Sequence, residues 1–475
     1  MLFNSLEYLI FLPAVFIFYW ALRRSVLWQN LFTVAVSWIF YGWWDWRYLA
    51  LLGGYTVWAY FAAIIMDGMT GQRRKCVLTL SVAVNLGILV AYKYFDFFTV
   101  SLARLLDSIS VHSDWATLNL VLPVGISFFT FQTLGYLIDV YRRKVPPCRD
   151  GAAFFAFVSF FPQLVAGPIE RADSLLPQFR RRREFRYAEA VDGMKRILWG
   201  LFKKMVIADN CAHAVSYIFH HSGELGSGDL ALGALFFTFQ IYGDFSGYSD
   251  IAIGSARLLG IRLVDNFLFP FFSRNVSDLW HRWHRSLNQW FSDYVYIPLG
   301  GSRNGMGATI RNLMIVFGLS GLWHGAEWTY VAWGLFNGAV MTVFIFYRHV
   351  TRHRRPGHTR RILHWLSVGA TFCVLCVGFV IFRCHSMSHA VSYLGRLFSF
   401  TTGTAAPYKY TMMLLCYIGI FILIEYCNRH RAYGFDFSSD GILRHRTARW
   451  TLYWLTTMAT FILAGSSSDF IYFQF

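Results

Sequence analysis

The sequence predicts an all-α, polytopic integral membrane protein that forms one membrane domain over residues 1–475. Hydrophobic residues make up 56% of the chain, charged residues only 15%, and the mean hydropathy is +0.41. Apolar runs of roughly 18 residues or more recur, and each is long enough to cross a hydrocarbon core about 30 Å thick. Because these runs are continuous and do not alternate, an outer-membrane β-barrel is excluded.

The candidate spans are taken from these apolar runs in chain order. The first run, YLIFLPAVFIFYWAL, has no basic region before it and no small-residue cleavage site after it. This predicts a first span and not a cleavable signal. The full set of candidate spans is residues 6–22, 28–43, 46–66, 76–95, 118–140, 152–166, 196–220, 229–258, 308–325, 328–347, 363–382, 411–427 and 449–465.

Two segments predict departures from simple spans. The stretch VLPVGISFFTFQTLGYLIDVY contains Pro123, Gly125 and several polar residues. A broken, polar helix is tolerated in a membrane only where it faces protein or a cavity, so we expect residues 121–136 to line one of these. The stretch 179–204 mixes basic residues with a periodic apolar face, which predicts an interfacial amphipathic helix that continues into a span.

The net charge of +17 comes largely from short basic runs between spans. Such runs are typical of topology signals, and some are suited to contact anionic lipid headgroups. This interpretation is favoured over nucleic-acid binding. The runs are Arg73–Lys75, Arg142–Lys144, Arg180–Arg183, Arg348–Arg361 and Arg429–Arg431.

The eight cysteines do not predict a disulfide framework, since most lie within or beside apolar runs. Cys373 and Cys376 form a C-x-x-C motif inside the apolar run VGATFCVLCVGFV. No second pair accompanies it, so packing residues are favoured over a zinc or redox site.

His324 lies in LSGLWHGAEW, between two apolar runs. An ionisable group within the bilayer is costly, which makes it a candidate functional residue. A neutral imidazole can remove the proton of an alcohol as its oxygen attacks an acyl carbon. Gly321 and Gly325 would allow a substrate or another backbone segment to approach closely. The alternative is a packed histidine that bonds to a neighbouring carbonyl.

The segment DLWHRWHRSLNQW, residues 278–290, predicts one amphipathic helix with His281 and His284 on the same face. A metal site is the alternative: His281, His284 and His324 would supply nitrogen ligands and Asp244 or Asp250 an oxygen. One H-x-x-H and one isolated histidine are few ligands for such a site, so no metal is predicted.

Embedded polar residues form a second group of candidates, and their clustering is more informative than any single member. Asp244, Asp250 and Arg257 are interpreted as an intramembrane ion pair or a helix cap. The other members are Asn85, Gln132, Gln163, Gln240, Tyr242, Ser246, Tyr248 and Asn337.

Several of these motifs together resemble one family. WHRWHRSLNQWFSDYVYIPLGGSR followed by GLWHG is similar to motifs of the membrane-bound O-acyltransferase (MBOAT) family, in its alginate O-acetyltransferase-like polysaccharide branch. Supporting stretches cover nearly the whole chain: MLFNSLEYLIFLPAVFIFYW, SFFTFQTLGYLIDVYRRK, FFPQLVAGPIERADSLLPQF, QIYGDFSGYSDIAIGSARLLGI and DFIYFQF.

The resemblance implies a ring of about 11–13 membrane helices around a central tunnel. It implies that His324 is the catalytic histidine and that His284 is the second active-site histidine, whereas His281 has no such counterpart. It also implies an O-acyltransferase without a permanently bound cofactor. Acetyl-coenzyme A or another acyl thioester, such as an acyl carrier protein, would be the donor.

The implied acceptor is a hydroxyl of an exported polysaccharide or of a periplasmic acetyltransferase-like relay partner. His324 would act as the base, and His284, a backbone N–H group or an arginine would stabilise the oxyanion. We expect the remaining candidates to contact substrate: Trp323, Trp328, Tyr294 and Tyr296 as tunnel walls, Arg282, Arg285 and Arg303 at the coenzyme A phosphates, and Gln240 and Asp244 as further binding residues.

Three alternatives stay open from the sequence. A D-alanyl transferase would draw on a carrier protein, a glycan or lipid transporter would need no base, and a scaffold would tolerate loss of both histidines. The expected location is the bacterial cytoplasmic (inner) membrane.

Overall fold

The computed structural model describes residues 1–111, 116–165, 167–351, 361–403, 411–437, 444–468 and 470–471. These residues form helices joined by turns and loops, as the sequence predicts, and contain no strand. Two compact units are distinguished: residues 1–193 with 252–264, and residues 194–251 with 265–475. The assignment of a single membrane domain stays a prediction.

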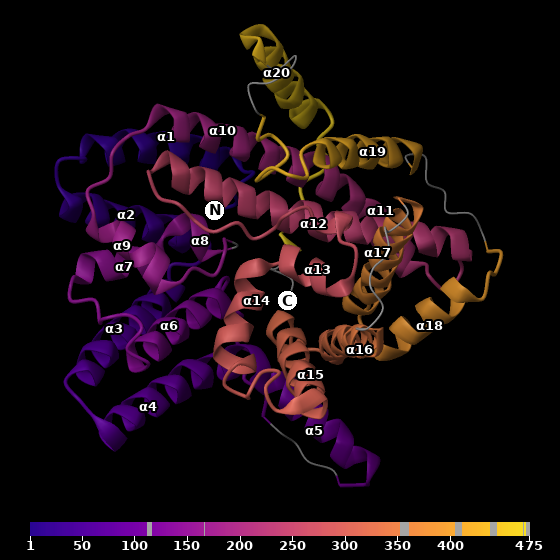
Figure 1. Cartoon of the computed structure of the whole chain (residues 1–475), viewed down its shortest axis with the longest axis horizontal. Helices are drawn as coiled ribbons and strands as arrows, with labels where there is room; N and C mark the ends of the chain where they lie inside the picture. The colour runs from indigo at the N-terminus through magenta and orange to yellow at the C-terminus, as the bar shows by residue number, and fades with distance from the viewer. Residues whose placement is uncertain are drawn as a thin grey trace. The chain divides into compact units, whose positions relative to one another are not determined.

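The first unit contains the N-terminal helices. Within it α3, α4 and α6 pack side by side, as the indigo and violet ribbons of Figure 1 show. Its elements are α1 (Leu6–Ala21), α2 (Val26–Gly42), α3 (Tyr48–Asp67), α4 (Gly71–Leu89), the π-helical η1 (Val90–Tyr94), α5 (Phe95–Ser108), α6 (Ile126–Tyr141), α7 (Gly151–Ser159), α8 (Phe161–Leu164) and α9 (Ala172–Arg180). Two further helices have residues in both units: α10 (Tyr187–Phe202) and α12 (Ser227–Leu258).

The second unit contains both candidate histidines. Its α15 and α16 are consecutive helices that pack against each other as a hairpin (Figure 1). Its elements are η2 (Lys203–Ala208), α11 (Asp209–His220), η3 (Pro270–Phe272), α13 (Val276–Arg282), α14 (Arg285–Phe291), η4 (Ser292–Tyr296), α15 (Gly305–His324), α16 (Trp328–Thr351), α17 (Arg361–Arg383), α18 (Met387–Phe398), α19 (Thr411–Cys427) and α20 (Arg446–Ile462).

Within the described ranges, five helical segments are long and apolar enough to cross a membrane. Two shorter apolar helices, α1 and α19, add to them. The five segments are residues 48–67, 71–108, 305–324, 328–351 and 362–383. The chain is therefore a multi-pass membrane protein, while the total of 11–13 membrane helices stays a prediction.

Three of the predicted spans and helices are interrupted. The candidate span 118–140 is helical only from Ile126, because Gly125 takes a left-handed φ of 78° and a Cβ there would meet the Leu164 carbonyl at 2.5 Å. The span 152–166 breaks at Phe160, which has a ψ of 109°. The stretch 179–204 is not one helix, since residues 181–186 separate α9 from α10.

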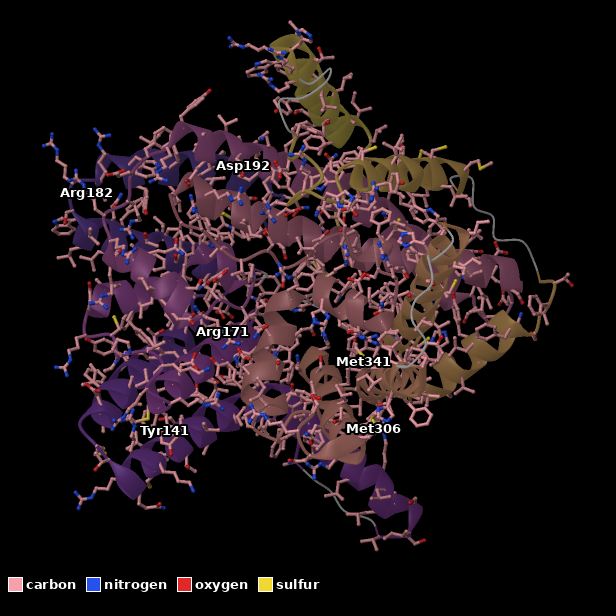
Figure 2. The ribbon with its side chains drawn as sticks, in the orientation of Figure 1. Tyr141, Arg171, Arg182, Asp192, Met306 and Met341 are labelled. Atoms are coloured by element: carbon pink, nitrogen blue, oxygen red, sulfur yellow. The ribbon has the colours of Figure 1, made fainter. Side chains whose placement is uncertain are left out.

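The interrupted α6 faces protein, as its polar residues predict. Gln132 donates to the Phe157 carbonyl at 2.9 Å, and Thr133 contacts the Asn85 amide oxygen at 3.1 Å. In the basic run before α10, the exposed Arg182 side chain lies at the edge of the ribbon (Figure 2). Residues 352–360 of another basic run, and residues 469 and 472–475 of the motif DFIYFQF, lie outside the described residues.

Candidate active site

His324 is the last residue of α15 and lies in an aromatic environment. The histidine is only 5% exposed. The Trp333 ring of α16 crosses the imidazole edge to face, with ring centroids 5.0 Å apart. Phe382 near the end of α17 lies at 5.6 Å in a similar arrangement. Three helices thus hold the predicted catalytic histidine between apolar rings.

The glycines around His324 are required by the close approach of α16. A Cβ at Gly321 would overlap the backbone carbonyl of Tyr330, and a Cβ at Gly325 would overlap the Tyr330 ring. Gly325 itself has extended backbone angles and follows the helix end. The sequence expectation that another backbone segment approaches these glycines is therefore confirmed for Gly321, whereas at Gly325 the close neighbour is a side-chain ring of α16.

We expect Gly321→Ala to destabilise the protein and to lower its thermal unfolding temperature in detergent. The added methyl must displace the Tyr330 backbone, and overpacking of this kind costs about 1–3 kcal/mol. Gly318→Ala, on the same helix, is the matched control, because the nearest atom to its Cβ is a flexible Leu335 methyl at 3.5 Å. Equal unfolding temperatures for the two variants would contradict the packing argument.

The predicted helix over residues 278–290 is wrong, because it breaks at Trp283 and His284. Helix α13 ends at Arg282 and α14 begins at Arg285. His284 has left-handed angles of φ 45° and ψ 52°, and Trp283 is extended. His281 and His284 therefore do not share one helix face. His281 is exposed and its Nδ1 contacts the Ser277 carbonyl at 2.6 Å, whereas His284 is only 2% exposed.

Asn266 orients His284. Its side-chain oxygen lies 3.4 Å from the Ser286 backbone nitrogen and 3.2 Å from His284 Nδ1. A backbone N–H can only donate, which identifies the Asn266 atom as the amide oxygen. That oxygen is an acceptor, so His284 Nδ1 carries the proton and Nε2 carries the lone pair. Backbone bonds from Arg285 to the Asn266 carbonyl and from Leu268 to the Arg282 carbonyl, both 3.0 Å, hold the two segments together.

Burial keeps His284 neutral. Desolvation lowers the pKa of the His284 imidazole to about 3, because the surroundings disfavour the charged form. Phe245 of α12 forms an edge-to-face contact with the ring, with centroids 4.7 Å apart. The imidazole is thus uncharged at neutral pH.

The two candidate histidines are brought together in the second unit. Their ring centroids lie 6.3 Å apart, and the Trp323 ring is 5.8 Å from His284 and 5.0 Å from His324. Within the described part of the chain, no group of three or more His, Cys, Asp or Glu side chains could hold a metal ion. Chemically, the pair offers two imidazoles to one substrate group in a buried, aromatic setting.

The other predicted contact residues differ in their surroundings. Trp323 is buried beside both histidines, whereas Trp328 is 55% exposed at the start of α16. Tyr294 packs on Trp290 with ring centroids 5.0 Å apart, and the Tyr296 hydroxyl contacts Ser302 at 3.4 Å. Gln240 is half-buried on α12. The roles assigned to these residues stay predictions.

The three arginines predicted to bind phosphates are also dispersed. Arg282 donates to Asp278 at 2.7 Å and lies on α13, while Arg285 is exposed on α14 and contacts the Asp265 carbonyl at 3.3 Å. Arg303 is exposed in the turn before α15. Their assignment to coenzyme A stays a prediction.

The predicted ion pairing of Asp244, Asp250 and Arg257 is correct in kind, but the three residues do not pair with each other. Asp250 binds Arg196 at 2.7 Å and Lys203 at 2.6 Å. Asp244 binds Lys204 at 2.8 Å, and Arg257 pairs with Asp192. A carboxylate held this firmly is part of the framework, and a substrate contact by Asp244 stays a prediction.

Sequence reasoning missed the residues that hold the two imidazoles. Asn266, Phe245, Trp333 and Phe382 contact them from three separate regions of the chain. The only available signal for Asn266 and Phe245 was their position in the unusually polar region 240–328. Nothing local distinguishes Phe382 from other aromatic residues of an apolar helix.

Comparisons with known proteins match this chain to one family model and to several curated relatives. The family model described as MBOAT, membrane-bound O-acyltransferase family, matches residues 150–388, which include both histidines. A probable alginate O-acetylase of Pseudomonas putida is 38% identical over 404 residues, covering 84% of this chain and 81% of that protein. A peptidoglycan O-acetyltransferase of Helicobacter pylori is 32% identical over 100% of this chain and 98% of its own length. A teichoic acid D-alanyltransferase of Bacillus subtilis is 27% identical over 57% of this chain and 71% of its own.

Proposed function

Because the chain belongs to the membrane-bound O-acyltransferase family and is an O-acyltransferase, we propose that it moves an acetyl group from a thioester donor to a hydroxyl of a polysaccharide. The single observation that supports this best is the buried pair His284 and His324, with ring centroids 6.3 Å apart. We place the enzyme in the bacterial cytoplasmic membrane, with donor on the cytoplasmic side. The acceptor is an exported glycan or a periplasmic relay partner.

The proposed reaction is direct transfer. His324 removes the hydroxyl proton as the oxygen attacks the thioester carbonyl carbon, and the carbon–sulfur bond then breaks. The proton passes from His324 to the leaving thiolate, so the imidazole returns to its neutral form. This route needs no covalent acyl-enzyme, and no cysteine lies in the two histidine motifs.

The tautomer of His284 refines its role. Since Nδ1 donates to Asn266, Nε2 offers a lone pair and not an N–H group. A neutral His284 is therefore unsuited to stabilise an oxyanion, which needs a donor. We propose that His284 Nε2 accepts a hydrogen bond from an O–H or N–H of a substrate, and that a backbone N–H group supplies the oxyanion contact.

Acetyl transfer is preferred to D-alanyl transfer because of the relatives. The two acetylating relatives are 38% and 32% identical over 84% and 100% of the chain, against 27% over 57% for the D-alanyltransferase. This preference concerns only the acyl group that the donor carries, since the proposed histidine chemistry is the same for acetyl and for D-alanyl transfer.

The test of the donor uses purified protein in nanodiscs and radiolabelled acetyl-coenzyme A, with acetyl-loaded and D-alanyl-loaded acyl carrier protein as alternatives. Thioester loss and label on added glycan are measured, and the double variant His284→Ala/His324→Ala serves as the blank. Turnover with an acetyl thioester, absent in the blank, supports the proposal. Turnover only with the D-alanyl carrier would replace acetyl by D-alanyl transfer. If the purified protein consumes no donor while cells that carry the double variant still export the glycan, the chain is a transporter.

Asn266→Asp tests the tautomer through pH. A carboxylate beside Nδ1 favours the imidazolium, so the pKa of His284 should rise from about 3 to about 4–6. A raised pKa means that the neutral form of His284 is lost at higher pH, so kcat of Asn266→Asp should fall with an additional acid limb between about pH 4 and 6, beside the one that the base His324 gives in wild type and variant alike. Ser286→Ala, which removes another donor to the Asn266 oxygen without adding charge, is the matched control. Superimposable pH profiles for Asn266→Asp and wild type would contradict the assigned role.

A further inference from the structure

The segment that follows α20 returns to the interior of the second unit. We call residues 463–468, 470 and 471 the C-terminal segment. Its Leu463 carbonyl accepts from Asn210 at 2.8 Å, and its Gly465 nitrogen donates to the Met205 carbonyl at 2.9 Å. Phe470 and Ile471 are 0% and 2% exposed, so this end of the segment is buried, whereas residues 466 and 467 are exposed.

A buried charge cluster holds this segment. Lys204 lies 2.9 Å from Asp209 and 2.8 Å from Asp244, and all three residues are at most 3% exposed. One ammonium group thus faces two carboxylates. Buried carboxylates that lack enough donors are costly, so the cluster requires further N–H or O–H groups.

The C-terminal segment supplies those donors. The Ser468 hydroxyl donates to Asp209 at 2.5 Å, and the Ile471 backbone N–H donates to Asp244 at 2.6 Å. Lys204 in turn donates to the Ser468 carbonyl at 2.9 Å. Removing the segment would leave both carboxylates short of partners, which explains why the segment stays inside.

The C-terminal segment places Phe470 one aromatic ring away from His284. The Phe470 ring packs on Tyr248 with centroids 4.1 Å apart and lies 6.3 Å from the Phe245 ring. Phe245 in turn forms the edge-to-face contact with His284, at 4.7 Å. All these residues belong to the second unit.

We propose that Phe470 is a positioning residue for the acyl-transfer site: it closes the space behind Phe245 and so fixes the His284 ring and keeps water from it. The C-terminal segment is then part of the active site's framework, held by the cluster of Lys204, Asp209 and Asp244. Its contribution to rate rests on the proposed function, whereas its packing behind His284 does not.

The test compares Phe470→Ala with Phe470→Leu and with the control Phe435→Ala. Phe435 is 1% exposed in the same unit, and its ring contacts are with Trp199 and Phe437, away from both histidines. The first readout is the rate at which diethyl pyrocarbonate modifies His284, followed by peptide mass spectrometry. The exposed His281 is an internal standard in every sample. The second readout is kcat and KM with the donor that the wild type uses.

We expect diethyl pyrocarbonate to modify His284 about tenfold faster in Phe470→Ala than in wild type or in Phe435→Ala. Its kcat should fall about ten- to a hundredfold with KM little changed, because misplacing a catalytic group lowers the rate more than it lowers binding. Phe470→Leu, which keeps most of the volume, should recover much of both. Unchanged His284 modification in a folded Phe470→Ala, or equal losses in Phe470→Ala and Phe435→Ala, would overturn the proposal.

The two readouts separate this proposal from the proposed function. Faster His284 modification in a chain that consumes no acyl donor would support the positioning role and refute acyl transfer. Normal turnover by wild type, together with unchanged His284 modification and unchanged kcat in Phe470→Ala, would support acyl transfer and refute the positioning role. If Phe470→Ala fails to fold, the same comparison is made with Phe470→Leu and with Ser468→Ala. The Ser468→Ala substitution removes the hydroxyl that donates to Asp209 and leaves the Phe470 ring in place.

Discussion

Replacing His324 by alanine should lower kcat by about 10²–10⁴-fold and leave KM nearly unchanged. The imidazole is proposed to remove a proton only as the hydroxyl attacks, so its loss removes stabilisation of the transition state and not of the bound substrates. The measurement is initial rate against donor concentration for wild type and His324→Ala in nanodiscs, at saturating acceptor.

His281→Ala is the matched control for this substitution. It removes the same kind of side chain from the same unit, but His281 is exposed and is bonded to its own helix at Ser277. We expect its kcat to stay within about twofold of wild type, as for most surface substitutions. A His324→Ala enzyme that retains half of the wild-type kcat would show that His324 is only a packing residue of the α15–α16 hairpin.

Replacing Arg196 by methionine should have the largest effect on stability. Arg196 is 2% exposed and joins Asp250 at 2.7 Å to Asp265 at 2.6 Å. Removing one member of a buried ionic group leaves carboxylates without their cation, which costs about 3–5 kcal/mol. We expect the lower end of this range, because Lys203 remains 2.6 Å from Asp250. Thermal unfolding in detergent measures the change.

The same variant should also reduce activity, because Asp265 precedes the Asn266 that orients His284. Arg262→Met is the control: its partner is Glu189, Arg262 is 68% exposed, and such surface pairs contribute at most about 1 kcal/mol. Adding Asp265→Asn to Arg196→Met should recover part of the stability, since it removes one uncompensated carboxylate. If Arg196→Met and Arg262→Met unfold at the same temperature, the buried ion pairs of Arg196 stabilise the protein no more than the exposed pair of Arg262 does.

Much of the helical architecture could be predicted because apolar runs leave a direct record in the sequence. The runs around His324 appear as α15 and α16, and the glycines beside it marked a close approach that the structure assigns to Tyr330. Breaks were harder to predict. The i,i+3 spacing of His281 and His284 fits a helix, yet the left-handed backbone of His284 ends it. Histidine adopts that conformation more often than most non-glycine residues do, but it is still uncommon, so tertiary contacts must hold it.

The sequence by itself determined the class of protein, the helical elements and the two histidines, since hydropathy and short motifs are local properties. Only the tertiary structure decided what surrounds them. Asn266 reaches His284 across 18 residues, Arg196 reaches Asp250 across 54, and Ile471 reaches Asp244 across 227. Buried polar groups must find partners wherever the chain brings them together, and that requirement leaves no pattern in neighbouring residues. The neutral state of His284 and the contact of Phe470 with Tyr248 and Phe245 therefore follow from tertiary packing alone.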